Sequence, residues 1–175
     1  MFLIPDQIIR RLDISQGITA VDFGCGTGHW SIALAKQIGD SGKVYAVDIQ
    51  KEMLEATKSR AEALGLLNVE VVRGDLDEDN GSGLSSDIAD FVLISNVLFQ
   101  ADKREGMVKE AFRVLKSGGE VAIIEWNESD IPIGPPKQLK LKMEDARKMF
   151  LESGFVFKDD FPAGEHHYGL LFKKV

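Results

Sequence analysis

Short apolar runs alternate with longer amphipathic segments along most of the chain. Runs rich in β-branched and other apolar side chains predict strands at 18–23, 43–49, 68–74, 89–96 and 120–126. Apolar residues at helical spacing predict helices at 6–13, 29–38, 50–65, 103–119 and 141–154. Gly65 closes one of these helices, and Gly118 and Gly119 are expected to stop another.

Five alternations of strand and helix predict an α/β fold, because right-handed crossovers place helices on both faces of a parallel sheet. Two further strands, 155–161 and 167–174, are joined by the short segment 162–166 and should be antiparallel to each other. We therefore expect one domain over residues 1–175, built on a doubly wound, mostly parallel seven-stranded sheet with an antiparallel closing strand. The segments 77–87 and 128–138 are predicted to be loops.

Composition and charge mainly exclude other classes of protein. The formal net charge of −7 disfavours a broad basic face for nucleic acid, which needs clustered lysine and arginine. No apolar run approaches the roughly 18 residues that span a bilayer, and Pro5 and Asp6 interrupt the apolar start too early for a secretory signal. The single cysteine, Cys25, suits a reducing compartment, so we expect a cytoplasmic protein.

A cluster of glycines follows the first predicted strand, in the stretch VDFGCGTG. In open α/β sheets, ligands bind beyond the carboxyl ends of the strands, and a helix that begins there offers free amides. Gly24, Gly26 and Gly28 form G-x-G-x-G, and His29 stands where a dinucleotide fingerprint needs its last glycine. The chain has no phosphate-binding G-x-x-x-x-G-K-[ST] motif either. These features predict a site for a nucleoside-bearing cofactor.

The stretch VDFGCGTG resembles the first motif of Rossmann-like S-adenosylmethionine-dependent methyltransferases. Later stretches, SNVLFQ and EAFRVLKSGGEVAIIEW, resemble further motifs of the family, and small relatives of the ubiquinone/menaquinone C-methyltransferase group are the most similar. The resemblance implies S-adenosylmethionine as cofactor, with Asp48 on the ribose hydroxyls and Asp75 near the adenine amino group. The cofactor-binding residues that it implies are Asp22, Gly24, Cys25, Gly26, Gly28, Asp48, Ile49, Asp75, Leu76 and Asn96.

The acceptor side carries a weaker pattern. If the strand 155–161 runs parallel to the first five, the turn after it lies at the ligand edge of the sheet. His167 is then the candidate general base, because histidine titrates near neutral pH, with Tyr168 as the alternate and Asn96 as a further catalytic candidate. The structural alternative is a surface turn with one side chain packed inward. Glu125, Trp126 and the segment 134–136 could line the acceptor pocket.

Three other kinds of methyl transfer are disfavoured. Methylation of an exocyclic adenine nitrogen needs two prolines after the fourth strand, and SNVLFQ has none. The pyrimidine C5 route needs a nucleophilic cysteine, and Cys25 lies inside the cofactor loop. Asn96 stands where a catechol-type metal site needs an acid, so we expect no metal.

We therefore expect metal-independent methyl transfer to a small molecule. Two alternatives remain: a cofactor-binding regulatory or partner subunit, or a methyltransferase that acts on RNA or protein. Only about 17 residues precede the first predicted strand, so an amino-terminal lid is mostly missing, and a second copy in a homodimer could close the site. An enzyme that uses an adenosyl cofactor in another way is a more distant alternative.

Overall fold

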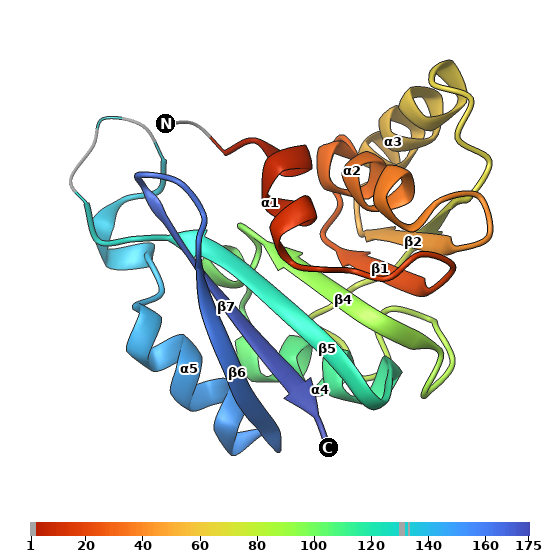
Figure 1. Ribbon diagram of the computed structural model, residues 1–175. Coiled ribbons are helices and arrows are strands. Elements are labelled where there is room, and N and C mark those ends of the chain that lie inside the picture. Colours follow the sequence, from red (N-terminus) through yellow and green to blue (C-terminus); the bar gives the residue numbers. More distant parts are fainter. Residues whose placement is uncertain (1–2, 130–131, 133) are drawn as a thin grey trace.

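The computed structural model describes residues 3–129, 132 and 134–175. One seven-stranded sheet runs through it in the order β3-β2-β1-β4-β5-β7-β6 (Figure 1). The parallel strands are β1 (Thr19–Phe23), β2 (Lys43–Asp48), β3 (Val69–Arg73), β4 (Ala89–Ser95) and β5 (Leu115–Trp126). The strands β6 (Phe155–Pro162) and β7 (His167–Lys174) are antiparallel to each other, and β7 is antiparallel to β5. The predicted fold class is confirmed.

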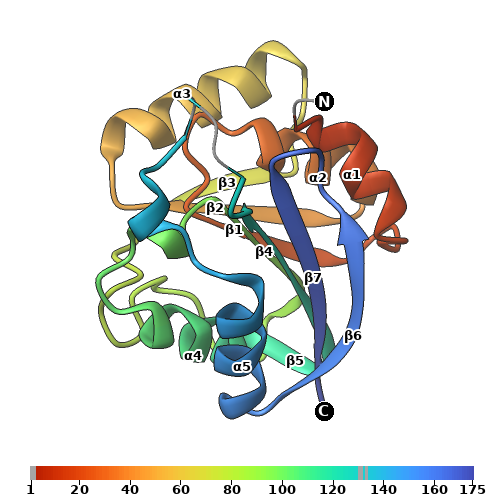
Figure 2. The same ribbon diagram turned by 90° about the vertical axis from the view of Figure 1, so that its left-hand side faces the viewer.

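Helices cover both faces of the sheet (Figures 1 and 2). On one face lie α1 (Pro5–Arg11), α2 (His29–Ile38) and α3 (Lys51–Ala63), and on the other lie α4 (Arg104–Val114) and α5 (Met143–Glu152). Two short 3-10 turns, η1 (Leu98–Gln100) and η2 (Lys137–Leu139), lie in the connections after β4 and β5. The η2 turn falls partly within the loop predicted at 128–138, of which positions 130, 131 and 133 lie outside the described residues.

The strand order reverses between β1 and β4, which are hydrogen-bonded neighbours at the centre of the sheet. Ligands of doubly wound folds bind at the carboxyl ends of the strands beside such a reversal. Because β6 is antiparallel to β7 and β7 to β5, β6 runs parallel to β5. The connection 163–166 therefore lies at the same edge as the loops after β1 and β4, as the sequence predicted.

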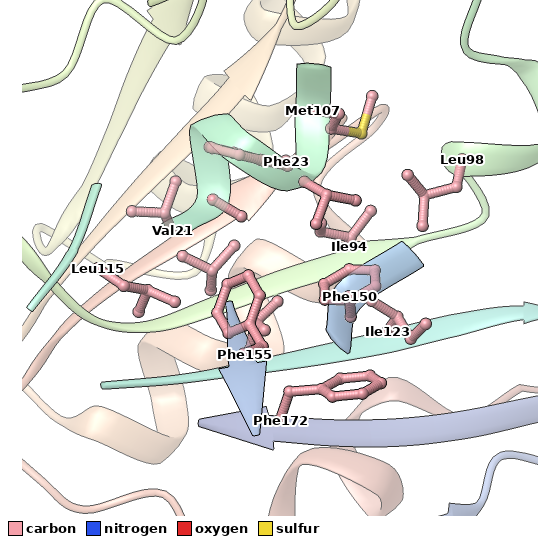
Figure 3. Packing of buried hydrophobic residues seen from close by; sticks show 14 of the residues in the cluster. Val21, Phe23, Ile94, Leu98, Met107, Leu115, Ile123, Phe150, Phe155 and Phe172 are labelled. Carbon is pink, nitrogen blue, oxygen red and sulfur yellow. The ribbon is translucent and has the colours of Figure 1, made fainter. Parts of the chain in front are cut away.

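An aromatic cluster anchors α5 and the antiparallel strands to the sheet (Figure 3). The ring of Phe150 stacks on that of Phe172 with centroids 4.7 Å apart, and Phe155 lies 5.4 Å from Phe150. All three side chains are buried in the core between the sheet and the helices α4 and α5. The sequence forms this closure because α5 carries its apolar side chains on one face.

The helix predicted at 103–119 is wrong over its last five residues, since α4 ends at Val114 and β5 begins at Leu115. Leu115 is fully buried in the core, so its burial overrides the helical preference of the segment. Gly118 and Gly119 lie inside β5, where the pairing with β4 is irregular. A Cβ on Gly119 would lie 2.9 Å from the Leu115 side chain and from the Lys116 carbonyl oxygen, and 3.1 Å from the Asp90 carbonyl oxygen of β4. The lack of a side chain at Gly119 thus permits the close approach of β4 and β5, and this glycine does not end a helix.

Replacing Phe150 with alanine should lower the free energy of unfolding by roughly 3–5 kcal/mol, because it leaves a cavity in the aromatic cluster. The neighbouring Leu151 is 46% exposed, so Leu151→Ala is the matched control and should change stability by less than about 1 kcal/mol. Urea unfolding measures both values. Equal losses in the two variants would show that the aromatic cluster does not anchor α5.

Candidate functional site

The loop between β1 and α2 turns through three glycines with positive φ angles, Gly24 (71°), Gly26 (52°) and Gly28 (84°). A Cβ on Gly24 would overlap the Val97 side chain, and one on Gly28 would lie 2.7 Å from Thr57 Oγ1. Packing within the protein therefore excludes side chains at these two positions. A Cβ on Gly26 would meet no described atom within 4 Å, so of the three loop glycines only Gly26 faces open space.

Asp48, the last residue of β2, holds this glycine loop in place. One of its carboxylate oxygens accepts the Gly26 N–H at 2.9 Å, and the other accepts the Gln50 N–H at 2.9 Å. The Thr57 hydroxyl donates to the Gly26 carbonyl oxygen at 2.8 Å from α3. The loop is thus fixed by the strand and the helix beside it.

A second carboxylate, Asp22, is buried beneath the loop at the end of β1. It accepts a hydrogen bond of 2.6 Å from the hydroxyl of Ser31 in the first turn of α2. Burial raises the pKa of Asp22 to about 7, against the lowering effect of the Ser31 hydrogen bond, and the charge of Asp48 adds to the rise. Burial also raises the pKa of the Cys25 thiol to about 12, so this thiol stays protonated and is no nucleophile.

A pocket of about 430 Å³ opens in front of this loop, at the carboxyl ends of the four strands β1 to β4. Its lining includes most of the residues that the sequence predicted to bind a cofactor: Gly24, Gly26, Asp48, Ile49, Asp75, Leu76 and Asn96. It also includes residues that the sequence analysis missed: Gln50, Met53, Gly74, Asp77, Val97, Gln100, Ala101 and Met107. Several of these lie within three residues of Asp48 or Asp75, and others belong to the stretch SNVLFQ. Their nearness to these motifs could have identified them as lining residues. Three predicted residues do not line the pocket: Asp22 lies beneath the loop, and Cys25 and Gly28 belong to the loop itself.

Asn96 directly follows β4 and has a φ angle of 56°. Asparagine adopts this left-handed conformation more readily than most residues. Its N–H donates to the Ile124 carbonyl oxygen at 2.8 Å, and its side-chain Oδ1 is buried without a hydrogen-bond partner among the described residues. Asn96 is thus a lining residue of the pocket that carries a buried, unused acceptor.

His167 and Tyr168 lie at the start of β7 and point to opposite faces of the sheet. The His167 imidazole packs on the ring of Trp126 with centroids 4.1 Å apart, and burial lowers its pKa to about 4. The Tyr168 hydroxyl donates to the buried Leu141 carbonyl oxygen at 2.9 Å, and burial raises its pKa. Neither residue lines the pocket. The position of Tyr168 favours a packing role, and the catalytic role of His167 stays a prediction.

A family model described as a methyltransferase domain matches residues 14–163. The chain therefore belongs to this family of methyltransferases, as the resemblance implied. It is 35% identical over 122 residues to the demethylmenaquinone methyltransferase of Bacillus mycoides, which covers 70% of this chain and 50% of that protein. The corresponding enzyme of Oceanobacillus iheyensis is 34% identical over 120 residues, covering 69% and 49%. The chain thus spans about half the length of these curated relatives.

Solved structures agree with this family. The crystal structure of a SAM-dependent methyltransferase from Aquifex aeolicus matches with a TM-score of 0.91 and 25% identity, over 99% of this chain and 91% of that one. The [4+2]-cyclase SpnF matches with a TM-score of 0.82 and 15% identity, over 97% and 80% of the two chains, which shows a shared fold alone. Within the described residues, no helix could cross a membrane, and no group of three or more His, Cys, Asp or Glu side chains could hold a metal ion.

The buried Asp22 predicts a specific dependence of stability on pH. Because its pKa rises from 3.8 to about 7 on folding, the folded state keeps a proton that the unfolded state loses first. The stability that this proton contributes is complete below about pH 4 and is lost as the pH rises through about 7. We expect the difference in unfolding free energy between wild type and Asp22→Asn to change by roughly 2–4 kcal/mol across this range in urea titrations.

The exposed Asp160 provides the control, since Asp160→Asn removes a carboxylate that is not buried. Its stability curve should stay parallel to that of the wild type over the same range. Parallel curves for Asp22→Asn and wild type would mean that Asp22 is ionised throughout, against the effect of its burial.

Proposed function

We propose that this chain binds S-adenosylmethionine in the pocket before the glycine loop and transfers its methyl group to a small aromatic acceptor of the quinol class. The open space at Gly26, beside the carboxylates of Asp48 and Asp75, is the observation that carries the cofactor assignment. The acceptor class is supported by the demethylmenaquinone methyltransferases that are 34–35% identical to this chain.

The pocket suits this cofactor in charge and shape. Asp48, Asp75 and Asp77 line it, and acceptors of this kind complement a cationic ligand that carries hydroxyl and amino donors. Ile49, half exposed at the pocket, and Leu76 offer apolar surface to a flat base. When bound, S-adenosylmethionine supplies a methyl group activated by the sulfonium charge. The chain's own part is to hold the two reactants in line and to exclude water.

Unpartnered polar atoms support an acceptor site beside this pocket. Among the described residues, four of the five buried side-chain atoms without a hydrogen-bond partner are Ser95 Oγ, Asn96 Oδ1, Glu125 Oε2 and His167 Nε2. They lie at the ends of β4 and β5 and the start of β7, at one edge of the sheet. Buried polar groups are normally paired, so such a group of exceptions supports a polar ligand. The pKa of about 4 keeps His167 neutral, and a neutral imidazole can accept a hydrogen bond from a phenolic hydroxyl.

Other expectations from the sequence stay predictions. They are closure of the pocket by a second copy of the chain, the lack of a nucleic-acid partner, a cytoplasmic location and metal independence. The last is open to a simple check, since turnover should persist in excess EDTA.

Calorimetry and a methyl-transfer assay test the proposed function together. The protein should bind S-adenosylmethionine and S-adenosylhomocysteine but not NAD, and it should transfer a labelled methyl group to a short-chain demethylmenaquinol. Tight NAD binding without S-adenosylmethionine binding would overturn the cofactor assignment. Binding without transfer to any quinol would overturn the acceptor class and favour the binding-subunit alternative.

Gly26 offers a sharper test of where the cofactor binds. Gly26→Ala places a methyl group in the open space of the loop and should weaken S-adenosylhomocysteine binding about tenfold or more. Gly65, another glycine with positive φ and open space beside it, gives the control Gly65→Ala. Both variants should lose roughly 1–2 kcal/mol of stability from the left-handed backbone. Equal cofactor affinities in the two variants would remove Gly26 from the binding surface.

A further inference from the structure

The short turn after β4 is held at its two ends by groups of opposite charge. One carboxylate oxygen of Glu125 accepts the N–H groups of Val97 and Leu98 at 3.0 and 2.8 Å. The Arg104 guanidinium donates to the carbonyl oxygens of Leu98 at 2.8 Å and Phe99 at 3.0 Å. An anion on the free amides and a cation on the free carbonyls both complement the dipole of a helical turn.

Glu125 makes these contacts from an unfavourable position. The residue is fully buried at the end of β5, and its second carboxylate oxygen has no partner among the described residues. The titratable groups that face it are the charged Arg104 from α4 and the neutral phenol of Tyr168 from β7, with Asp145 of α5 acting on Tyr168. Burial raises the pKa of Glu125 to about 7, although the turn's amides and Arg104 favour its charged form. The desolvation cost of a buried carboxylate with one unpaired oxygen means that stability alone does not favour Glu125 at this position.

The turn that Glu125 holds forms a wall of the pocket. Val97, Gln100 and Ala101 line the pocket, and the Val97 side chain fills the space beside Gly24 of the glycine loop. Asn96, with its unused acceptor, directly precedes the turn. A third Arg104 hydrogen bond, to the Leu139 carbonyl oxygen at 3.4 Å, ties η2 to the same turn. A displacement of the turn would therefore move both the cofactor pocket and the acceptor side.

We propose that Glu125 is a positioning residue for methyl transfer: with Arg104, it fixes the 96–101 wall on which cofactor and acceptor meet. Glu125 does not line the pocket, so it acts through the backbone of Val97 and Leu98. It does on the acceptor side what Asp48 does for the glycine loop. The inference rests on the proposed function, because it assigns a role within that reaction.

The variant Glu125→Gln tests this role, because an amide keeps the shape and one acceptor oxygen but removes the charge. We expect it to fold, to shift the NMR amide signals of residues 96–101, and to bind S-adenosylhomocysteine several-fold more weakly. The kcat of methyl transfer should fall about a hundredfold, since small misplacements of reactants have effects of this size. In wild type, the Val97 and Leu98 amide signals should also titrate together near neutral pH, and in Glu125→Gln they should not.

Glu120→Gln is the matched control, because Glu120 lies on the same strand and pairs with Lys158 away from the turn. It should leave the amide signals of residues 96–101, the cofactor affinity and kcat unchanged. If Glu125→Gln does not fold, Arg104→Lys probes the turn from its other end and should shift the same amide signals and lower kcat.

The outcomes separate the two proposals. A wild-type protein that binds S-adenosylhomocysteine, together with a Glu125→Gln variant equal to it in amide signals, affinity and kcat, overturns this inference alone. An Arg104→Lys variant equal to wild type, used where Glu125→Gln is unfolded, does the same. A wild-type protein that binds neither S-adenosylhomocysteine nor S-adenosylmethionine overturns the proposed function and this inference with it.

Discussion

Two carboxylates hold the backbone from which the pocket is built. Asp48, at the end of β2, accepts the Gly26 amide in the loop after β1. Glu125, at the end of β5, accepts the Val97 and Leu98 amides in the turn after β4. Each carboxylate thus belongs to the strand beside the one whose loop it holds, on either side of the reversal in strand order. Because Val97 packs against Gly24, the two held segments meet at that reversal.

This arrangement concentrates electrostatic cost at one edge of the sheet. Asp22 and Glu125 are both buried there with raised pKa values. The unpartnered acceptors of Asn96 and Glu125 lie at the same edge of the sheet. Proteins tolerate local violations of this kind mainly where function requires them. The buried carboxylates and unpaired acceptors therefore indicate the same site as the glycine loop.

Much of this could be predicted from the sequence because the relevant signals are local. Strand–helix alternation predicted the sheet. Asp48 and Asp75 could be placed because Asp48 ends β2 and Asp75 lies two residues after β3. The end of α4 could not be predicted, since only the burial of Leu115 in the folded core decides it. The role of Glu125 depends on the register between β4 and β5, which no local pattern encodes. The sequence also predicts Tyr168 as the alternate to His167 on the acceptor side, although its face of β7 packs into the core.

Hydrogen–deuterium exchange with and without S-adenosylhomocysteine tests whether the cofactor binds between the two held segments. A second hollow, lined by Lys43, Leu67 and Glu70 among others, lies at the opposite ends of β2 and β3 and serves as the internal comparison. Bound ligand should slow exchange at residues 24–28, 48–50, 74–77 and 96–101 and leave residues 65–71 unchanged. Protection confined to residues 65–71, or none at 24–28 under saturating ligand, would contradict binding between the two held segments.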